Sequence, residues 1–431
     1  MSRQIIQYSR TLGFYKPSTF RIHISTNFSF SRFDDRDWSV FAHEYMHFIQ
    51  DISTVNGAYN IYVISEYLKS FASAQKEAPN REVHLPYFPD DSFNVNTNQC
   101  LNELTFGNSG ESDGLRITDL IPEKENLGNI LGDIDVAKFK VEYADGHQED
   151  VYFGANAVKE SMAYIMESYI APVSMSAQDY PYRFADMVVE FIYPEFAVDR
   201  LNVLALCDIA LLSSNPGPVF VWWLDKMKKE GYLPLKPEDL YDRAYDMMTE
   251  DRGRDCTERS LIDSIEDYIR LGANSLSDYF QDQFFSHIKN WIEDIFNKAI
   301  KLRRDCRSFI IDIARSGNLK QNSIFSLILN DYLGAPLLTN EFGQLSSKCP
   351  LGNIEGEMLP LAAVGEILNT LMHGKRKCLL SSVCSLLKDV SVSEACSHSP
   401  WLHQADETNH CPYAIMWRHW NWRGCNPVFN D

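Results

Sequence analysis

The sequence predicts a mainly helical α+β protein, and three features support that class. From Gly154 almost to residue 390, the chain reads as amphipathic helical segments separated by Gly, Pro and Asn. The alternation typical of strands occurs only near the front of the chain, at residues 20–28 and 138–153. With 45% hydrophobic and 23% charged residues in a chain of 431, the composition is that of a globular protein.

Differences in composition, and Gly, Pro and Asn residues that interrupt regular structure, divide the chain into four regions. Residues 1–77 contain a strand followed by an amphipathic helix, and residues 78–154 form an irregular insertion with one hairpin. Residues 155–345 are a helical body, and residues 346–431 are rich in Cys and Trp. We therefore expect a small N-terminal β element, an insertion, and a helical C-terminal body.

The N-terminal region predicts one strand and two helices. In Phe20–Phe28, apolar and polar residues alternate as in a half-buried strand. Acidic residues from Asp34 onward suit the start of a helix, and Asn56-Gly57 is a plausible stop. A second helical run covers Ala58–Glu77.

Turn residues and hydrophobic periodicity predict the hairpin and the helices further along the chain. Within residues 138–153, Asp145-Gly146 supplies the positive φ angles of a tight turn between two alternating strands. We expect further helices at residues 155–171, 197–212, 219–230, 261–271, 276–302 and 359–373.

Charge and cysteine content limit the partners and the compartment. Lys and Arg total 40 against 59 for Asp and Glu, and the net charge of −19 disfavours binding to nucleic acid or to a membrane surface. The first ten residues contain no apolar run of the kind found in export signals, and Leu201–Leu224 is too interrupted to span a bilayer. We therefore expect a cytoplasmic protein with reduced thiols.

The segment His43-Glu44-Tyr45-Met46-His47 carries the clearest chemistry. Two histidines four residues apart on a helix share a face, so both imidazoles can reach one Zn²⁺, and Glu44 lies where it can take a proton from a metal-bound water. Gln50 and Thr54 fall on the same side as the histidines. A solid apolar stripe occupies the opposite side, and this segregation favours a metal site over two structural histidines.

A catalytic zinc requires a third protein ligand. The extended pattern H-E-x-x-H-x-x-G-x-x-H is excluded, because Gln50 and Ser53 stand where it needs Gly and His. In the helix that follows Gly154, Glu160 and Glu167 share one face with the small Ala163 between them. We predict Glu160 as the third ligand and Glu167 as a partner of a ligand histidine or a substitute for Glu160. Periodicity alone does not choose between the two.

H-E-x-x-H followed by a helix with Glu160, Ala163 and Glu167 in the pattern E-x-x-A-x-x-x-E resembles the gluzincin branch of zinc metallopeptidases. In that branch the second helix commonly reads E-G-x-A, and its Glu is the third zinc ligand. This chain has Ser161 in place of that Gly, and residues 78–154 lengthen the interval between the helices. The resemblance implies a zincin-like core in which the Phe20–Phe28 strand lies beside the cleft and pairs with substrate backbone.

The resemblance also implies an activity: hydrolysis of peptide bonds in a protein or peptide substrate, with His43, His47 and Glu160 on the metal and Glu44 as general base. The chain lacks the G-x-M-E-N segment of aminopeptidases, so we expect an endopeptidase. The helical body beyond Ala171 would wall the cleft. Two alternatives remain: a catalytically inactive zinc-binding interaction module, and a helical scaffold without metal.

Two further features remain unassigned by sequence. The C-terminal region contains a scattered set of possible ligands without a C-x-x-C knuckle: Cys396, His398, His403, His410, Cys411 and Cys425. We favour buried thiols and loop histidines there over a second zinc. The Tyr or His that would stabilise an oxyanion cannot be chosen among 21 tyrosines.

Overall fold

The computed structural model confirms the mainly helical α+β class, with 58% helix, 15% strand and small sheets. Among the described residues, no helix is both long and apolar enough to cross a membrane. The structure describes residues 12–26, 28–77, 82–89, 93–127, 132–173, 176–246, 248–250, 258–348 and 356–429.

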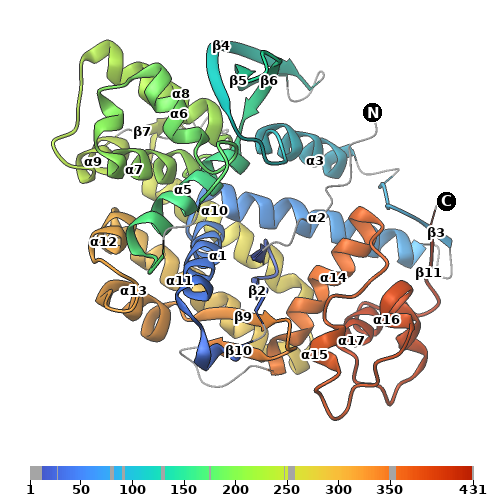
Figure 1. The fold of residues 1–431 in the computed structure, drawn as a ribbon. Coiled ribbons are helices and arrows are strands. Elements are labelled where there is room, and N and C mark those ends of the chain that lie inside the picture. The colour runs from blue at the N-terminus through green and yellow to red at the C-terminus, as the bar shows by residue number, and fades with distance from the viewer. Residues whose placement is uncertain are drawn as a thin grey trace.

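Helix α1 (Asp35–Ser53) lies at the centre of the molecule, where α5 (Ala155–Ile170) packs against it (Figure 1). A capping box starts α1: the Asp34 side chain accepts from the Asp37 backbone N–H, and the Asp37 side chain accepts from that of Asp34. The apolar stripe of α1 packs into the core, while α5 covers the histidine side. Both faces of the helix are therefore held by neighbours.

Helix α2 (Val55–Glu77) follows α1 after a single extended residue, Thr54. The predicted stop at Asn56-Gly57 is therefore wrong, because these residues lie inside the first turn of α2. The Thr54 hydroxyl accepts from the Gly57 N–H at 3.1 Å and so caps the new helix. A Cβ on Gly57 would lie 2.3 Å from the Asp51 Cα, so the sharp corner requires glycine.

A four-stranded sheet runs beside α1 in the order β1-β2-β9-β10. Its strands are β1 (Gly13–Lys16), β2 (Arg21–Ile24), β9 (Ala335–Asn340) and β10 (Leu345–Lys348). The strand predicted at residues 20–28 exists as the shorter β2, but it is an interior strand, antiparallel to β1 and parallel to β9. Both of its edges are paired, so the expectation that this strand offers a docking edge beside the cleft is wrong.

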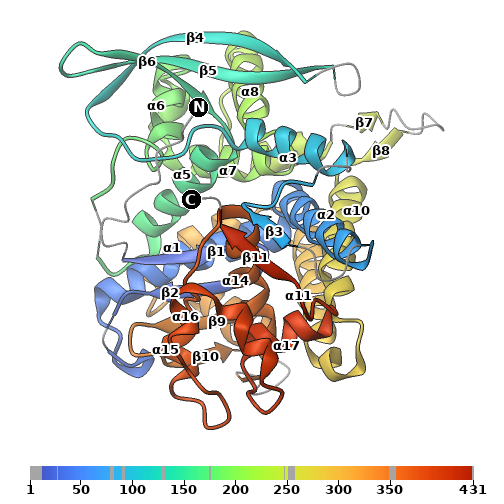
Figure 2. The same ribbon diagram turned by 90° about the vertical axis from the view of Figure 1, so that its right-hand side faces the viewer.

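The insertion builds a separate sheet at one end of the molecule, opposite the C-terminal helices (Figure 2). The predicted hairpin is confirmed as β5 (Asp133–Tyr143) and β6 (Gln148–Phe153), with Gly146 at φ +84° in its turn. The pattern did not predict β4 (Leu115–Asn126), which pairs with β5, or helix α3 (Phe93–Phe106).

Two further strand pairings complete the sheets, one between distant parts of the chain and one local. Strand β3 (Glu82–Leu85) pairs in parallel with β11 (Asn426–Phe429), which ties the insertion to the C-terminal region. Strands β7 (Met248–Glu250) and β8 (Glu258–Ser260) form a small antiparallel ribbon.

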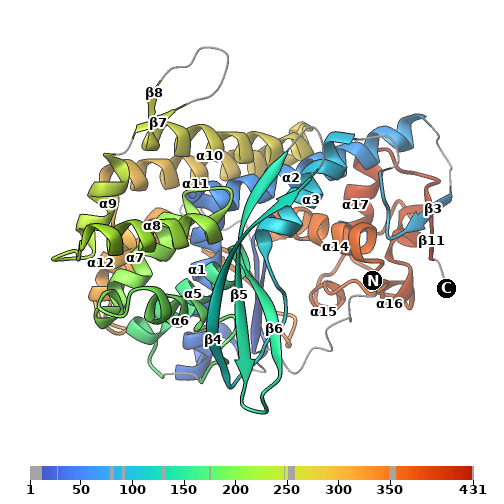
Figure 3. The ribbon, with the colours of Figure 1, turned by 90° about the horizontal axis from the view of Figure 1, so that it is seen from above.

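Helices form the rest of the molecule, and α10 lies alongside α2 and α11 (Figure 3). The predicted helix at residues 276–302 is interrupted, because the chain turns at residues 278–285 before α11 begins. The remaining helices are α6 (Phe184–Ile192), α7 (Arg200–Leu211), α8 (Pro216–Glu230), α9 (Glu238–Tyr245), α10 (Leu261–Ser277), α11 (Ser286–Asp305), α12 (Phe309–Arg315), α13 (Ser323–Leu327), α14 (Leu359–His373), α15 (Ser381–Cys384), α16 (Ala395–His398) and α17 (Pro412–His419).

A fully buried ion pair holds the end of α1 in place. Arg303 on α11 donates to both carboxylate oxygens of Asp208 on α7, at 2.6 and 2.7 Å. Arg303 also donates to the Ser53 carbonyl at 2.9 Å, and Tyr241 donates to Asp208 at 2.8 Å. Because every charged atom of the pair has a partner, the cluster fixes three helices around the last turn of α1.

Candidate metal centre

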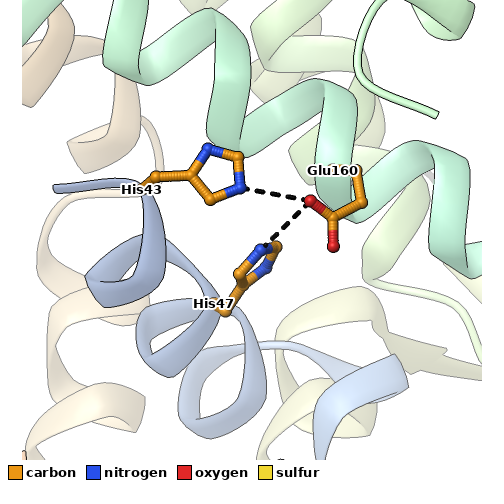
Figure 4. Close-up of side chains that lie close together, drawn as sticks. All are labelled: His43, His47 and Glu160. Carbon is orange, nitrogen blue, oxygen red and sulfur yellow. Dashed lines mark hydrogen bonds and ion pairs between the residues drawn. The ribbon is translucent and has the colours of Figure 1, made fainter. Parts of the chain in front are cut away.

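The structure brings the three predicted ligands together. His43 and His47 come from α1, and Glu160 comes from the facing helix α5 (Figure 4). The Glu160 Oε2 atom lies 3.1 Å from His43 Nε2 and 3.4 Å from His47 Nε2. One ligand atom from each residue lies within 4.8 Å of the others, and this is the only such group of His, Cys, Asp or Glu among the described residues.

Hydrogen bonds set the orientation of both imidazoles. His43 Nδ1–H donates to Glu167 Oε2 at 3.1 Å, and His47 Nδ1–H donates to Gln50 Oε1 at 2.9 Å. Gln50 is itself oriented, because its Nε2 donates to the Lys159 carbonyl at 3.0 Å. Both Nε2 atoms are thereby directed at Glu160, and the structure places Glu167 as the expected partner of a histidine.

The electrostatics of the three residues follow from their contacts. Burial alone would lower the pKa of His43, but its hydrogen bonds to Glu160 and Glu167 outweigh burial and raise that pKa well above its usual value. Burial would also lower the pKa of His47, but the charge and the hydrogen bond of Glu160 together outweigh burial and raise that pKa. In turn, both imidazoles overcome the effect of burial on Glu160 and lower the pKa of its carboxyl. Without metal, the group is therefore a strongly coupled cation–anion cluster.

Glu44 is buried and lines the same cavity as the three ligands. Burial raises the pKa of Glu44, an effect that the nearby His43 and His47 and a hydrogen bond from the Tyr15 backbone only partly offset. Strand β1 approaches α1 closely here. A Cβ on Gly13 would lie 2.6 Å from Val40 Cγ1 and 2.8 Å from a backbone oxygen of β2, so this approach requires glycine.

The ligands open onto a cavity of about 370 Å³. Its walls come from β1, α1, α2, α3 and α5, and Tyr182 is its one lining residue beyond Ala171 among those described. The expectation that the helical body would wall the cleft is therefore wrong. The insertion supplies that wall instead, because α3 packs against both α2 and α5.

Tyr182 is a site residue that sequence reasoning missed. Its ring lies edge-on to the His43 imidazole with 5.9 Å between centroids, and its hydroxyl donates to Glu111 Oε1 at 3.2 Å. Ser161, which stands where gluzincins commonly have Gly, holds this segment. Its hydroxyl donates to the Pro181 carbonyl at 2.9 Å and accepts from a backbone N–H at the start of α6. No local pattern singles out Tyr182, since only tertiary packing brings it to α1.

The C-terminal cysteines and histidines do not converge in the same way. Cys396, Cys411 and Cys425 are buried, while His398 and His410 are exposed. His403 Nε2 lies 3.2 Å from Cys396 Sγ. The Nδ1 atom of His403 accepts from the Asn409 amide at 3.0 Å, so its Nε2 carries the proton and donates to sulfur. This tautomer cannot take a proton from the thiol, which argues against a nucleophilic cysteine here.

Comparisons of the chain with protein-family models, curated proteins and solved structures found no match.

Proposed function

We propose that this protein is a zinc-dependent metallopeptidase of gluzincin type that acts as an endopeptidase. The observation that carries the proposal is the convergence of two histidine Nε2 atoms and a carboxylate oxygen from facing helices, in a cavity that Glu44 also lines. This is the ligand set of catalytic zinc sites with two histidines and one glutamate.

The donor set fits a zinc ion. Both Nδ1 atoms are already bound to Glu167 and Gln50, so the Nε2 atoms of His43 and His47 face one point and would offer their lone pairs to a metal that displaces the Nε2 protons. Glu160 adds one anionic oxygen at that point. Three protein ligands leave a fourth tetrahedral position, and the cavity provides room for it.

The remaining residues suit peptide hydrolysis. Zinc, when bound, polarises a water and the scissile carbonyl. Glu44 would accept the proton of the attacking water and pass it to the leaving amine, since it lines the cavity beside the three ligands. Tyr182 packs its ring against His43 and lines the cavity, and its hydroxyl would donate to the developing oxyanion after leaving the Glu111 carboxylate, to which it donates in the structure.

Among the described residues no strand pairs with the outer edge of β1, and this edge is the candidate docking edge for substrate backbone. The Ser25 N–H donates to the Leu12 carbonyl, so alternate residues Phe14 and Lys16 pair with β2. The backbone groups of Gly13 and Tyr15 therefore point away from β2, and the Tyr15 N–H already donates to Glu44. Both residues line the cavity, which would allow an extended peptide to add as a further strand.

The test combines metal analysis with cleavage of a peptide library. We expect about one zinc per chain, and Glu44→Gln should keep the metal while losing hydrolysis by about 10²- to 10⁴-fold. Tyr182→Phe should lower kcat more than it raises KM, with zinc content unchanged. Zinc binding without cleavage by the native protein would favour the interaction module, and absence of zinc from zinc-replete protein would remove the site altogether.

A further inference from the structure

We propose that the cavity beyond the ligands is a subsite for a carboxamide side chain, Gln or Asn, of a residue near the scissile bond. The inference rests on the proposed peptidase function and names its substrate class. It comes from an unusual lining: one ion pair and three asparagines, Asn60, Asn102 and Asn156.

The position of these residues suits a side chain next to the reacting bond. Asp51 follows His47 by four residues on α1, and Asn156 precedes Glu160 by four residues on α5. Four residues span one helical turn, about 6 Å along the axis. The subsite therefore begins one turn from the metal ligands on both helices, within reach of a side chain from a substrate bound there.

Lys159 supplies a hydrogen-bond donor and a positive charge. Its Nζ lies 3.1 Å from Asp51 Oδ1, and the two side chains are 13% and 2% exposed. Asp51 also accepts from the Tyr15 hydroxyl at 2.9 Å and the Ser18 N–H at 3.3 Å, so its oxygens are engaged. An ammonium has three N–H donors, and Lys159 lines the cavity, so beside its bond to Asp51 it can serve an incoming acceptor.

The asparagines supply acceptors. Asn156 Nδ2 donates to the Asn108 carbonyl at 3.0 Å, and Asn60 Nδ2 donates to Asn56 Oδ1 at 3.4 Å. The side-chain amide oxygens of Asn156 and Asn60 then remain as acceptors for a ligand. The Asn102 side chain makes no hydrogen bond to any described residue. Carbonyl oxygens repel a carboxylate, so this wall disfavours Asp and Glu.

A neutral group with both a donor and an acceptor can pair with Lys159 and with the asparagine oxygens at the same time. A carboxamide would donate its N–H groups to the asparagine oxygens and accept from Lys159, while Ile64 and Phe106 would contact its methylene groups. An aliphatic side chain would instead leave these polar groups unpaired, which costs more than the lost hydrogen bonds alone.

The experiment measures binding and cleavage separately. Fluorescent peptides that carry Gln, Asn, Glu, Lys or Leu at each of four central positions are titrated into zinc-loaded Glu44→Gln protein, and the same peptides are cleaved by the native enzyme. At one position, Gln or Asn should bind at least tenfold tighter than Leu, Glu and Lys. Asn102→Leu should reduce the Gln-to-Leu preference at least fivefold, whereas the matched variant Asn98→Leu, on the same helix outside the cavity lining, should not.

The possible results separate this inference from the proposed function. A carboxamide preference in binding without cleavage would support the subsite and overturn the peptidase. Cleavage with a preference for Leu, Glu or Lys, or a preference unchanged by Asn102→Leu, would overturn the subsite and leave the peptidase intact. Equal binding of all five peptides at every position would also overturn it.

Discussion

Replacing the two glutamates of α5 one at a time gives the sharpest test of the metal centre. Glu160 Oε2 lies between the Nε2 atoms of His43 and His47, whereas Glu167 Oε2 contacts only Nδ1 of His43. Glu160→Ala would therefore remove a proposed metal ligand. Glu167→Ala would remove the acceptor that orients His43, and would leave all three proposed ligands in the chain.

The expected magnitudes follow from these roles. Structural zinc sites with four ligands bind with roughly 10–16 kcal/mol, or about 2.5–4 kcal/mol per ligand, which corresponds to about 60- to 700-fold in affinity for Glu160→Ala. Loss of a partner that orients a ligand costs about 10- to 100-fold, which is the expectation for Glu167→Ala. Glu167→Gln retains an oxygen that can accept from His43 Nδ1–H, so it should recover most of that loss.

The assay is competition for zinc against a chromophoric chelator, with circular dichroism of each variant to confirm that the fold is retained. If Glu167→Ala weakens zinc binding more than Glu160→Ala, the ligand assignment moves to Glu167. Equal affinities of Glu167→Gln and Glu167→Ala would refute the role of the His43 hydrogen bond.

Further predictions concern pH and stability. The pKa values of His43 and His47 are raised above 6.5 in the metal-free protein, so their stabilisation is complete below pH 6.5 and is lost as pH rises through the raised values. The difference in Tm between the metal-free native protein and a variant with both His43→Ala and His47→Ala should accordingly shrink from pH 6 to pH 9, and a pH-independent difference would contradict the coupling. In urea unfolding, Arg303→Met should lower the free energy of unfolding by about 3–5 kcal/mol, because the substitution leaves the Asp208 carboxylate buried without its partner. Its exposed neighbour provides the control: Arg304→Met should leave the free energy of unfolding nearly unchanged, and similar losses from both variants would refute the argument.

Local patterns in the sequence were sufficient to predict the helix that carries the two histidines of the candidate metal site. The spacing of His43 and His47 places them on one face whatever surrounds the helix, because the helical repeat is set by backbone hydrogen bonds. The same periodicity put Gln50 beside the histidines and Glu160 with Glu167 on one face of the second helix. These relations are internal to one helix, so they could be predicted without knowing the fold.

Which of Glu160 and Glu167 faces the histidines depended on contacts between distant segments. The surroundings of the site depended on such contacts as well. Glu160 rather than Glu167 faces both Nε2 atoms because α5 packs against α1 at one particular offset, which no single-helix pattern contains. Strand β2 became an interior strand only because β9, more than 300 residues further along the chain, pairs with it. Tyr182 reached the His43 ring by the packing of a turn held by Ser161. Side-chain periodicity repeats within one element, whereas the offset between elements is set by how their surfaces pack, and packing decided the rest of the site.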